Sequence, residues 1–169
     1  MSILFEPNEM NGMKLKNRFV RSATHEAMAA LDGTIKDQLL HCMADLVLGE
    51  VGLVITGHAH VTREGQAGLR QMGAYSDSMI AGLQQVSSVV HENGGVVAIQ
   101  LAHAGIRGIG KNEYAALGPS NLSKEGAKVA AAMTDEDIQR TVKAFGDAAA
   151  RSVAAGTPSA RVRWQCAVL

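Results

Sequence analysis

The sequence predicts an α/β protein whose strands form a parallel sheet. Short runs rich in β-branched residues alternate with helical patterns about 15 to 20 residues long, which is the order of elements in βαβ units. Val51–Thr56 is a continuous apolar run, as expected of a strand that is covered on both faces. With 169 residues, of which 47% are apolar and 19% charged, the chain can bury a sizeable core.

The first βα unit follows an N-terminal segment with a turn signal at Asn11-Gly12. Its strand is expected over Arg18–Ala23, and a loop containing Asp32-Gly33 leads to the helix. Thr34 is a candidate N-cap, and Gly49 is a candidate C-terminal stop. Apolar residues recur between them at helical spacing: Leu39, Leu40, Met43, Leu46 and Val47.

The second unit combines the strand at Val51–Thr56 with a helix over roughly Ser78–Glu92. The Asn93-Gly94-Gly95 sequence ends this helix, and a third strand follows directly at Val96–Leu101. One face of the helix carries the apolar residues Ile80, Leu83, Val86 and Val90.

The third unit contains a long polar stretch, Gly105–Ala132, which we interpret as an active-site loop because connections of this length usually serve function or carry small elements of their own. A helix then begins at Thr134, which acts as the N-cap, and ends at Gly156. Its expected buried stripe is Ile138, Val142, Phe145, Ala149 and Val153. A fourth strand is due next, but Pro158, Arg161 and Arg163 interrupt the apolar run that it requires.

The charge balance names no macromolecular partner. Sixteen basic residues offset sixteen acidic ones, so no net field attracts nucleic acid or an anionic membrane surface. The sequence shows no apolar run of the roughly 18 residues that a membrane span needs and no signal peptide, so a cytoplasmic location is expected. The two cysteines lack the spacing of a disulfide framework or a metal site.

Several local sequences resemble the old yellow enzyme (NADH:flavin oxidoreductase) family, in particular the branch of 2,4-dienoyl-CoA and 2-enoate reductases. They are spread in order over about residues 3 to 156. They comprise Leu15–His25, Gly52–Gly57, Gln100–Gly105, Gly118–Ser120, Met133-Thr134 and Ala149–Gly156. Each of these sequences is weak alone, but their order and spacing make chance agreement improbable.

The resemblance implies a (β/α)8 TIM barrel that holds FMN at the carboxyl ends of its strands, of which this chain would form an incomplete N-terminal part of about three βα units. The implied reaction takes hydride from NADH or NADPH onto FMN and delivers it to a small-molecule substrate, an activated alkene or an enoyl thioester.

The resemblance also assigns flavin contacts to individual residues. The backbone of the segment ending strand one would lie along the isoalloxazine, with His25 tuning the flavin as a hydrogen-bond donor. A Gln amide offers the donor and the acceptor that the edge of the pyrimidine ring requires, which is the role implied for Gln100. The implied cofactor residues are Ser22, Ala23, Thr24, His25, Gly57, His58 and Gln100.

The family's substrate-activating residues have no counterpart in the sequence. The resemblance places a His-x-x-His/Asn pair on strand four with a Tyr after it, and this pattern is absent from the chain, so the catalytic residues are unknown. We therefore expect the family-like barrel portion to span residues 1–156 and an aberrant tail to span 157–169, as in a truncated or frameshifted product.

Two alternatives stay open at this point. The first is a non-catalytic fragment, a half-barrel without stable FMN binding, whose open strand edge favours self-association into a homo-oligomer. The second is a metal-dependent barrel hydrolase, because His58 and His60 form a His-x-His pair at the end of strand two. No third ligand has a clear spacing, so we assign no metal site.

Overall fold

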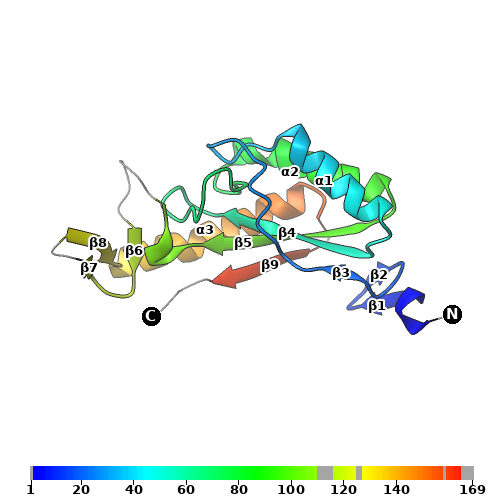
Figure 1. Cartoon of the computed structure of the whole chain (residues 1–169). Coiled ribbons are helices and arrows are strands. Elements are labelled where there is room, and N and C mark those ends of the chain that lie inside the picture. Colours follow the sequence, from blue (N-terminus) through cyan, green and yellow to red (C-terminus); the bar gives the residue numbers. More distant parts are fainter. Residues whose placement is uncertain (1, 110–115, 125–126, 158, 165–169) are drawn as a thin grey trace.

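The computed structural model describes residues 2–109, 116–124, 127–157 and 159–164. A parallel sheet lies at the centre, with its strands in the order β3-β4-β5-β9 (Figure 1). The strands span Val20–Arg21 (β3), Leu53–His60 (β4), Val96–His103 (β5) and Ser159–Trp164 (β9). The predicted α/β class with a parallel sheet is therefore observed, and the described strands form an open sheet.

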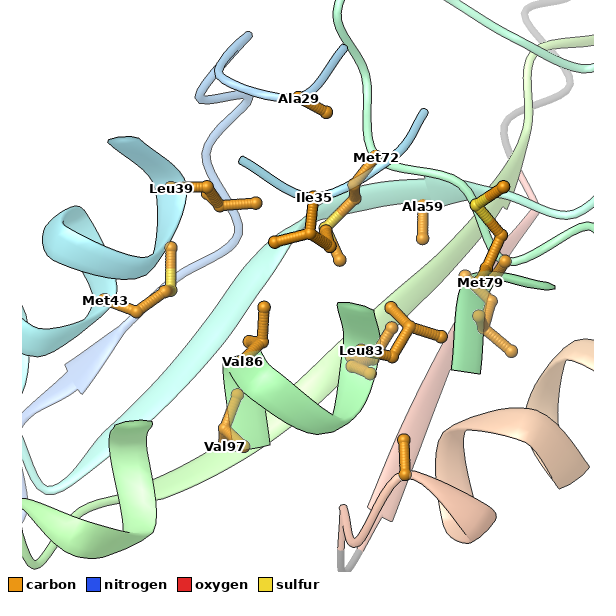
Figure 2. Close-up of a cluster of buried hydrophobic side chains, with 14 of the residues drawn as sticks. Ala29, Ile35, Leu39, Met43, Ala59, Met72, Met79, Leu83, Val86 and Val97 are labelled. Carbon is orange, nitrogen blue, oxygen red and sulfur yellow. The ribbon is translucent and has the colours of Figure 1, made fainter. Parts of the chain in front are cut away.

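Three helices follow the strands: α1 (Asp37–Leu48), α2 (Ile80–Glu92) and α3 (Asp135–Ala154). Side chains from all three join β4 and β5 in one buried apolar cluster, so the helices cover the same face of the sheet (Figure 2). From the helices this cluster takes Leu39, Met43, Val47, Leu83, Val86, Val90, Phe145 and Ala148, and from the strands Val54, Ala59, Val97, Ile99 and Leu101. In the described part of the chain no helix is both long and apolar enough to cross a membrane.

A smaller apolar cluster covers the opposite face of the sheet. It joins Leu53, Ile55 and Ala98 to Leu15 of an N-terminal hairpin. The hairpin pairs β1 (Asn8–Met10) with β2 (Met13–Leu15) and follows a 3-10 turn at Ile3–Phe5. The predicted turn at Asn11-Gly12 is confirmed, because both residues have positive φ, 48° and 82°, as a type I′ hairpin requires.

The N-terminus of α3 agrees with the sequence prediction. The Thr134 hydroxyl accepts from the Asp137 amide at 3.1 Å, and the Asp137 carboxylate accepts from the Thr134 amide at 3.0 Å, which completes a capping box. The predicted cap of α1 is wrong. Asp32 accepts from the Thr34 amide at 3.0 Å in a local turn, so the helix begins after Lys36.

The predicted buried stripe of α3 is also wrong in part. Ile138, Val142 and Val153 are exposed, whereas the helix buries Thr141, Phe145, Ala148 and Ser152. The hydroxyls of Thr141 and Ser152 donate to backbone carbonyls one turn back, at 2.7 and 2.9 Å, so these polar residues can face the core at little cost. A pattern of apolar residues cannot detect a face of this kind.

The long stretch after β5 carries small elements of its own. A 3-10 turn at Gly105–Arg107 precedes β6 (Ala116–Gly118), β7 (Leu122–Lys124) and β8 (Ala127–Ala132), which form a separate sheet in the order β6-β8-β7. This sheet lies at the end of the molecule opposite the N-terminal hairpin, beyond the carboxyl ends of the central strands (Figure 1).

The backbone of Ser159–Trp164 forms β9, although the sequence pattern led us to expect no regular strand there. It pairs in parallel with β5, in a register that runs from Ala98 opposite Ser159 to His103 opposite Trp164. The interrupted apolar pattern therefore does not prevent the backbone from continuing the sheet. The expected change at residue 156 from family-like sequence to an aberrant tail stays a prediction.

Candidate functional site

The candidate cofactor residues gather at the carboxyl end of the central sheet. Ser22–His25 directly follow β3, Gly57 and His58 lie on β4, and Gln100 lies on β5. The rings of His25 and His58 meet edge to face, with their centroids 4.8 Å apart. His58 lies opposite Gln100 in the β4–β5 register. The structure thus brings segments far apart in the sequence to one place.

A β-bulge determines which side chains of β4 face the candidate cofactor site. Ile55 pairs with Ala98, but the next pair is His58 with Gln100, so β4 holds one extra residue. If the same sequence paired without the bulge, Gly57 would lie opposite Gln100, and His58 would point toward the helices. At the bulge the Thr56 hydroxyl accepts a hydrogen bond from the backbone N–H of Gln100 at 3.2 Å and donates one to the Gly57 carbonyl at 2.8 Å.

Gln100 has the features of a ligand-binding amide. The residue is only 4% exposed, and its backbone N–H donates to the Thr56 hydroxyl. The side-chain amide of a Gln carries both donors and an acceptor. An amide of this kind at the end of a sheet is ready to pair with a polar ring edge.

The segment Ser22–His25 is held from both ends. Arg21, before it, and Glu26, after it, form an ion pair with Nη1 and Oε1 2.7 Å apart. Glu26 also accepts from the Gly57 amide at 3.1 Å, which attaches the segment to the β4 bulge. Gly57 has no room for a side chain, because a Cβ there would overlap the Glu26 carboxylate and lie 2.6 Å from the Thr24 carbonyl oxygen.

Three residues outside the predicted contacts support the site: Gln71, Arg21 and Glu26. Gln71, which is 1% exposed, donates to the His58 carbonyl at 3.0 Å and accepts from the Ala67 amide at 2.7 Å. It lies in an irregular loop where no motif or periodicity marks it. Arg21 and Glu26 could have been suspected only from their opposite charges on either side of the segment.

Two further histidines at this end of the sheet are buried and structural. His60 stacks on Tyr75 at 5.0 Å, and its Nδ1 donates to the Thr62 carbonyl at 2.9 Å. The Nδ1 of His103 accepts from the Gly105 amide at 3.0 Å. Burial lowers the pKa of both imidazoles, and in each of them Nε2 is buried without a hydrogen-bond partner among the described residues.

We expect the free energy of unfolding to fall as the pH drops below about 6.5, the ordinary pKa of an imidazole. Because the folded state lowers the pKa of His60 and His103, the unfolded chain takes up protons first. The contribution of these two groups is complete above that pH. Below it, the loss is at most about 1.4 kcal/mol per pH unit for each group.

Urea titrations at several pH values between 5 and 8 measure this loss. The variant His60→Asn, whose amide can still donate to Thr62 but cannot be protonated in this range, is expected to lose stability less steeply than the wild type. His41→Asn, at an exposed position of α1, controls for the removal of a histidine. A slope in His60→Asn equal to that of the wild type would contradict the role of His60.

Within the described part of the chain, the two histidines of the His-x-His pair have different neighbours. His58 packs against His25, whereas His60 packs against Tyr75. Among the described residues, no group of three or more His, Cys, Asp or Glu side chains could hold a metal ion. The described geometry therefore gives the hydrolase alternative no support.

Comparison with known proteins gives a consistent result over most of the chain. A family model described as the NADH:flavin oxidoreductase / NADH oxidase family matches residues 3–162. An NADPH dehydrogenase of Geobacillus thermodenitrificans is 35% identical over 92% of this chain and 46% of its own length. A probable NADH-dependent flavin oxidoreductase of Bacillus subtilis is 34% identical over 90% of this chain and 42% of its own. The chain thus spans less than half the length of these relatives.

Solved structures show the same fold. Old Yellow Enzyme from Pichia sp. AKU4542 superposes with a TM-score of 0.86 at 24% identity, over 95% of this chain and 45% of that one. A complex of 2-naphthoyl-CoA reductase with 2-naphthoyl-CoA gives a TM-score of 0.88 at 22% identity, over 95% of this chain and 27% of that one. These likenesses confirm the predicted fold, part of a (β/α)8 barrel whose described strands do not close.

Proposed function

Because the chain belongs to the NADH:flavin oxidoreductase / NADH oxidase family, we propose that its described residues form one side of an FMN site at the carboxyl ends of β3, β4 and β5. Membership confirms the resemblance that the sequence predicted. The descriptions of the family and of its relatives name flavin and NADH or NADPH.

The observation that carries the proposal is the position of Gln100, which is 4% exposed, lies opposite His58 and stands beside the His25–His58 contact. In a barrel enzyme the active site forms at this end of the strands. The buried amide supplies the donor and acceptor that suit the pyrimidine edge of FMN, and the absence of a side chain on Gly57 lets the backbone near Thr24 approach β4 closely. The residues therefore fit the cofactor.

The proposed roles follow from these positions. Gln100 binds the pyrimidine edge, while Ser22, Ala23 and Thr24 offer backbone groups to the ring. His25, which is exposed at the site, donates a hydrogen bond that stabilises the electron-rich reduced ring, and Gly57 and His58 meet the ring edge. When bound, FMN supplies hydride transfer between NADH or NADPH and a small-molecule substrate.

For the whole protein we propose reduction of an activated alkene or an enoyl thioester in the cytoplasm. We assign no catalytic residue within the described part of the chain. The test is reconstitution: the purified chain is mixed with FMN, gel-filtered and examined by absorbance. A flavin band that elutes with the protein supports the site. A colourless protein peak would favour the alternative of a fragment without stable FMN binding.

We expect Gln100→Leu to raise the dissociation constant for FMN about tenfold or more. The substitution removes both hydrogen-bonding groups, and each lost hydrogen bond is worth about 0.5–1.5 kcal/mol. Quenching of flavin fluorescence measures the affinity. Gln84→Leu, at an exposed position of α2, is the matched control and should bind FMN as the wild type does. If Gln100→Leu retains the wild-type affinity, Gln100 does not contact the cofactor.

A further inference from the structure

The two charged residues that flank the segment Ser22–His25 are largely withdrawn from water. The side chain of Arg21 is 16% exposed and that of Glu26 is 6% exposed. An ion pair at this depth is screened less than one on the surface, and its short separation of 2.7 Å is typical of a charge-assisted hydrogen bond. This pair closes the chain into a small loop that contains the proposed ring-contacting residues.

Each partner of the pair is also bound to β4. Arg21 donates from Nη1 to the Ile55 carbonyl at 3.0 Å, just before the bulge. The oxygen of Glu26 that faces Arg21 also accepts from the Gly57 amide, just after it. The ion pair therefore straddles the bulge and fixes the loop relative to the strand that carries His58.

Regular secondary structure does not hold this loop. Residues 22–28 lie in neither a helix nor a strand. Ala27, directly after Glu26, has a φ of 53°, in the left-handed region that a non-glycine residue adopts only at some cost. Such a conformation persists where the surrounding contacts impose it. The bonds of Glu26 are contacts of this kind.

We propose that Arg21 and Glu26 act as a positioning clasp, which presets the backbone of Ser22–His25 for the flavin ring before FMN binds. The inference rests on the proposed FMN site. Replacing a buried ion pair by apolar residues of similar volume often leaves stability unchanged or raises it. We therefore expect the clasp to affect the conformation of the loop more than the stability of the fold. A loop that is ordered in advance loses less entropy when FMN binds, so the clasp raises the FMN affinity.

Two variants of the whole chain separate positioning from stability. Glu26→Gln breaks the ion pair and leaves Arg21 without its counter-charge, so we expect faster amide hydrogen exchange in peptides covering residues 22–28 and an FMN dissociation constant raised about tenfold. The double variant Arg21→Met, Glu26→Met removes both charges. We expect it to recover wild-type thermal stability but not FMN affinity. Asp147→Asn, which breaks the exposed Lys143–Asp147 pair on α3, should change neither the hydrogen exchange over residues 22–28 nor the FMN dissociation constant.

Hydrogen exchange and FMN affinity together distinguish a failure of the clasp from a failure of the proposed FMN site. Wild-type exchange over residues 22–28 in both the Glu26→Gln and double variants would overturn the clasp, whether or not FMN binds. Wild-type FMN affinity in the double variant would overturn it as well, because the loop would then be correctly placed without the clasp. Failure of the wild-type chain to bind FMN, with exchange altered as expected in the variants, would reject the FMN site and leave the clasp as a loop-ordering device.

Discussion

Gly57→Ala is expected to lower the free energy of unfolding by about 1–3 kcal/mol, the usual cost of overpacking a filled site. It should also reduce FMN affinity by more than tenfold. The added Cβ overlaps the Glu26 carboxylate and approaches the Thr24 carbonyl oxygen to 2.6 Å. Thr24 contributes backbone rather than a flexible side-chain end, so the loop itself must move. The substitution thus displaces the proposed ring-contacting segment from β4.

Gly146→Ala is the matched control for this substitution. Gly146 lies within α3, and a Cβ there would meet nothing within 4 Å. Alanine should stabilise an exposed helix position by about 0.5–1 kcal/mol, the opposite sign to the effect at Gly57. Urea unfolding measures both values. If Gly57→Ala keeps wild-type stability and FMN affinity, the close approach of the loop to β4 is not required.

Leu83→Ala is expected to lower the free energy of unfolding by about 2–5 kcal/mol, because it leaves a cavity in the main core. Leu83 is 0% exposed and lies on α2 among side chains from the sheet and the other helices, as Figure 2 shows. A loss of this size is a large part of the stability of a typical domain, so FMN binding should weaken indirectly as the folded population falls.

Leu48→Ala supplies the comparison for Leu83. Leu48 ends α1 and is 65% exposed, so its truncation should change stability by no more than about 0.5 kcal/mol. Denaturant unfolding of both variants, followed by circular dichroism, measures the difference. Similar losses in the two variants would mean that α2 does not pack on the sheet as described.

Local chemistry explains why some elements could be predicted from the sequence. The capping box at Thr134 uses only residues close in the chain, and the turn at Asn11-Gly12 needs only two residues tolerant of positive φ. The helix expected from Ser78 agrees with a 3-10 turn at Asp77–Met79 that continues into α2. The apolar strands on either side of it follow from burial on both faces.

Features that depend on distant contacts escaped sequence reasoning. Arg21 and Glu26 were not linked with Gly57, because only the folded chain brings their charges to the amide at the bulge. The strand expected over Arg18–Ala23 is short in the structure because the chain leaves β4 after Arg21 to form the loop. The strand expected to end at Thr56 continues to His60, since the bulge lets it resume pairing with β5.

The family resemblance located the candidate site more sharply than residue patterns could. Gln100 as a single amide within an apolar run has many explanations, and its pairing with His58 becomes visible only in the β4–β5 register. The contact between His25 and His58 is equally invisible along the chain. The cofactor roles of these residues stay predictions.

The extra residue in β4 interrupts the alternation of side chains along the strand. Before the bulge the even-numbered Val54 faces the helices, and after it the odd-numbered Ala59 does. Val54 and Ala59 both face the helices although five positions separate them, which strict alternation forbids. Loss of one residue at Thr56 or Gly57 would restore strict alternation, with His58 still opposite Gln100 and Ala59 still facing the helices. A single-residue gap at this point in an alignment of homologous sequences is therefore compatible with an unchanged arrangement of the side chains on either side of it.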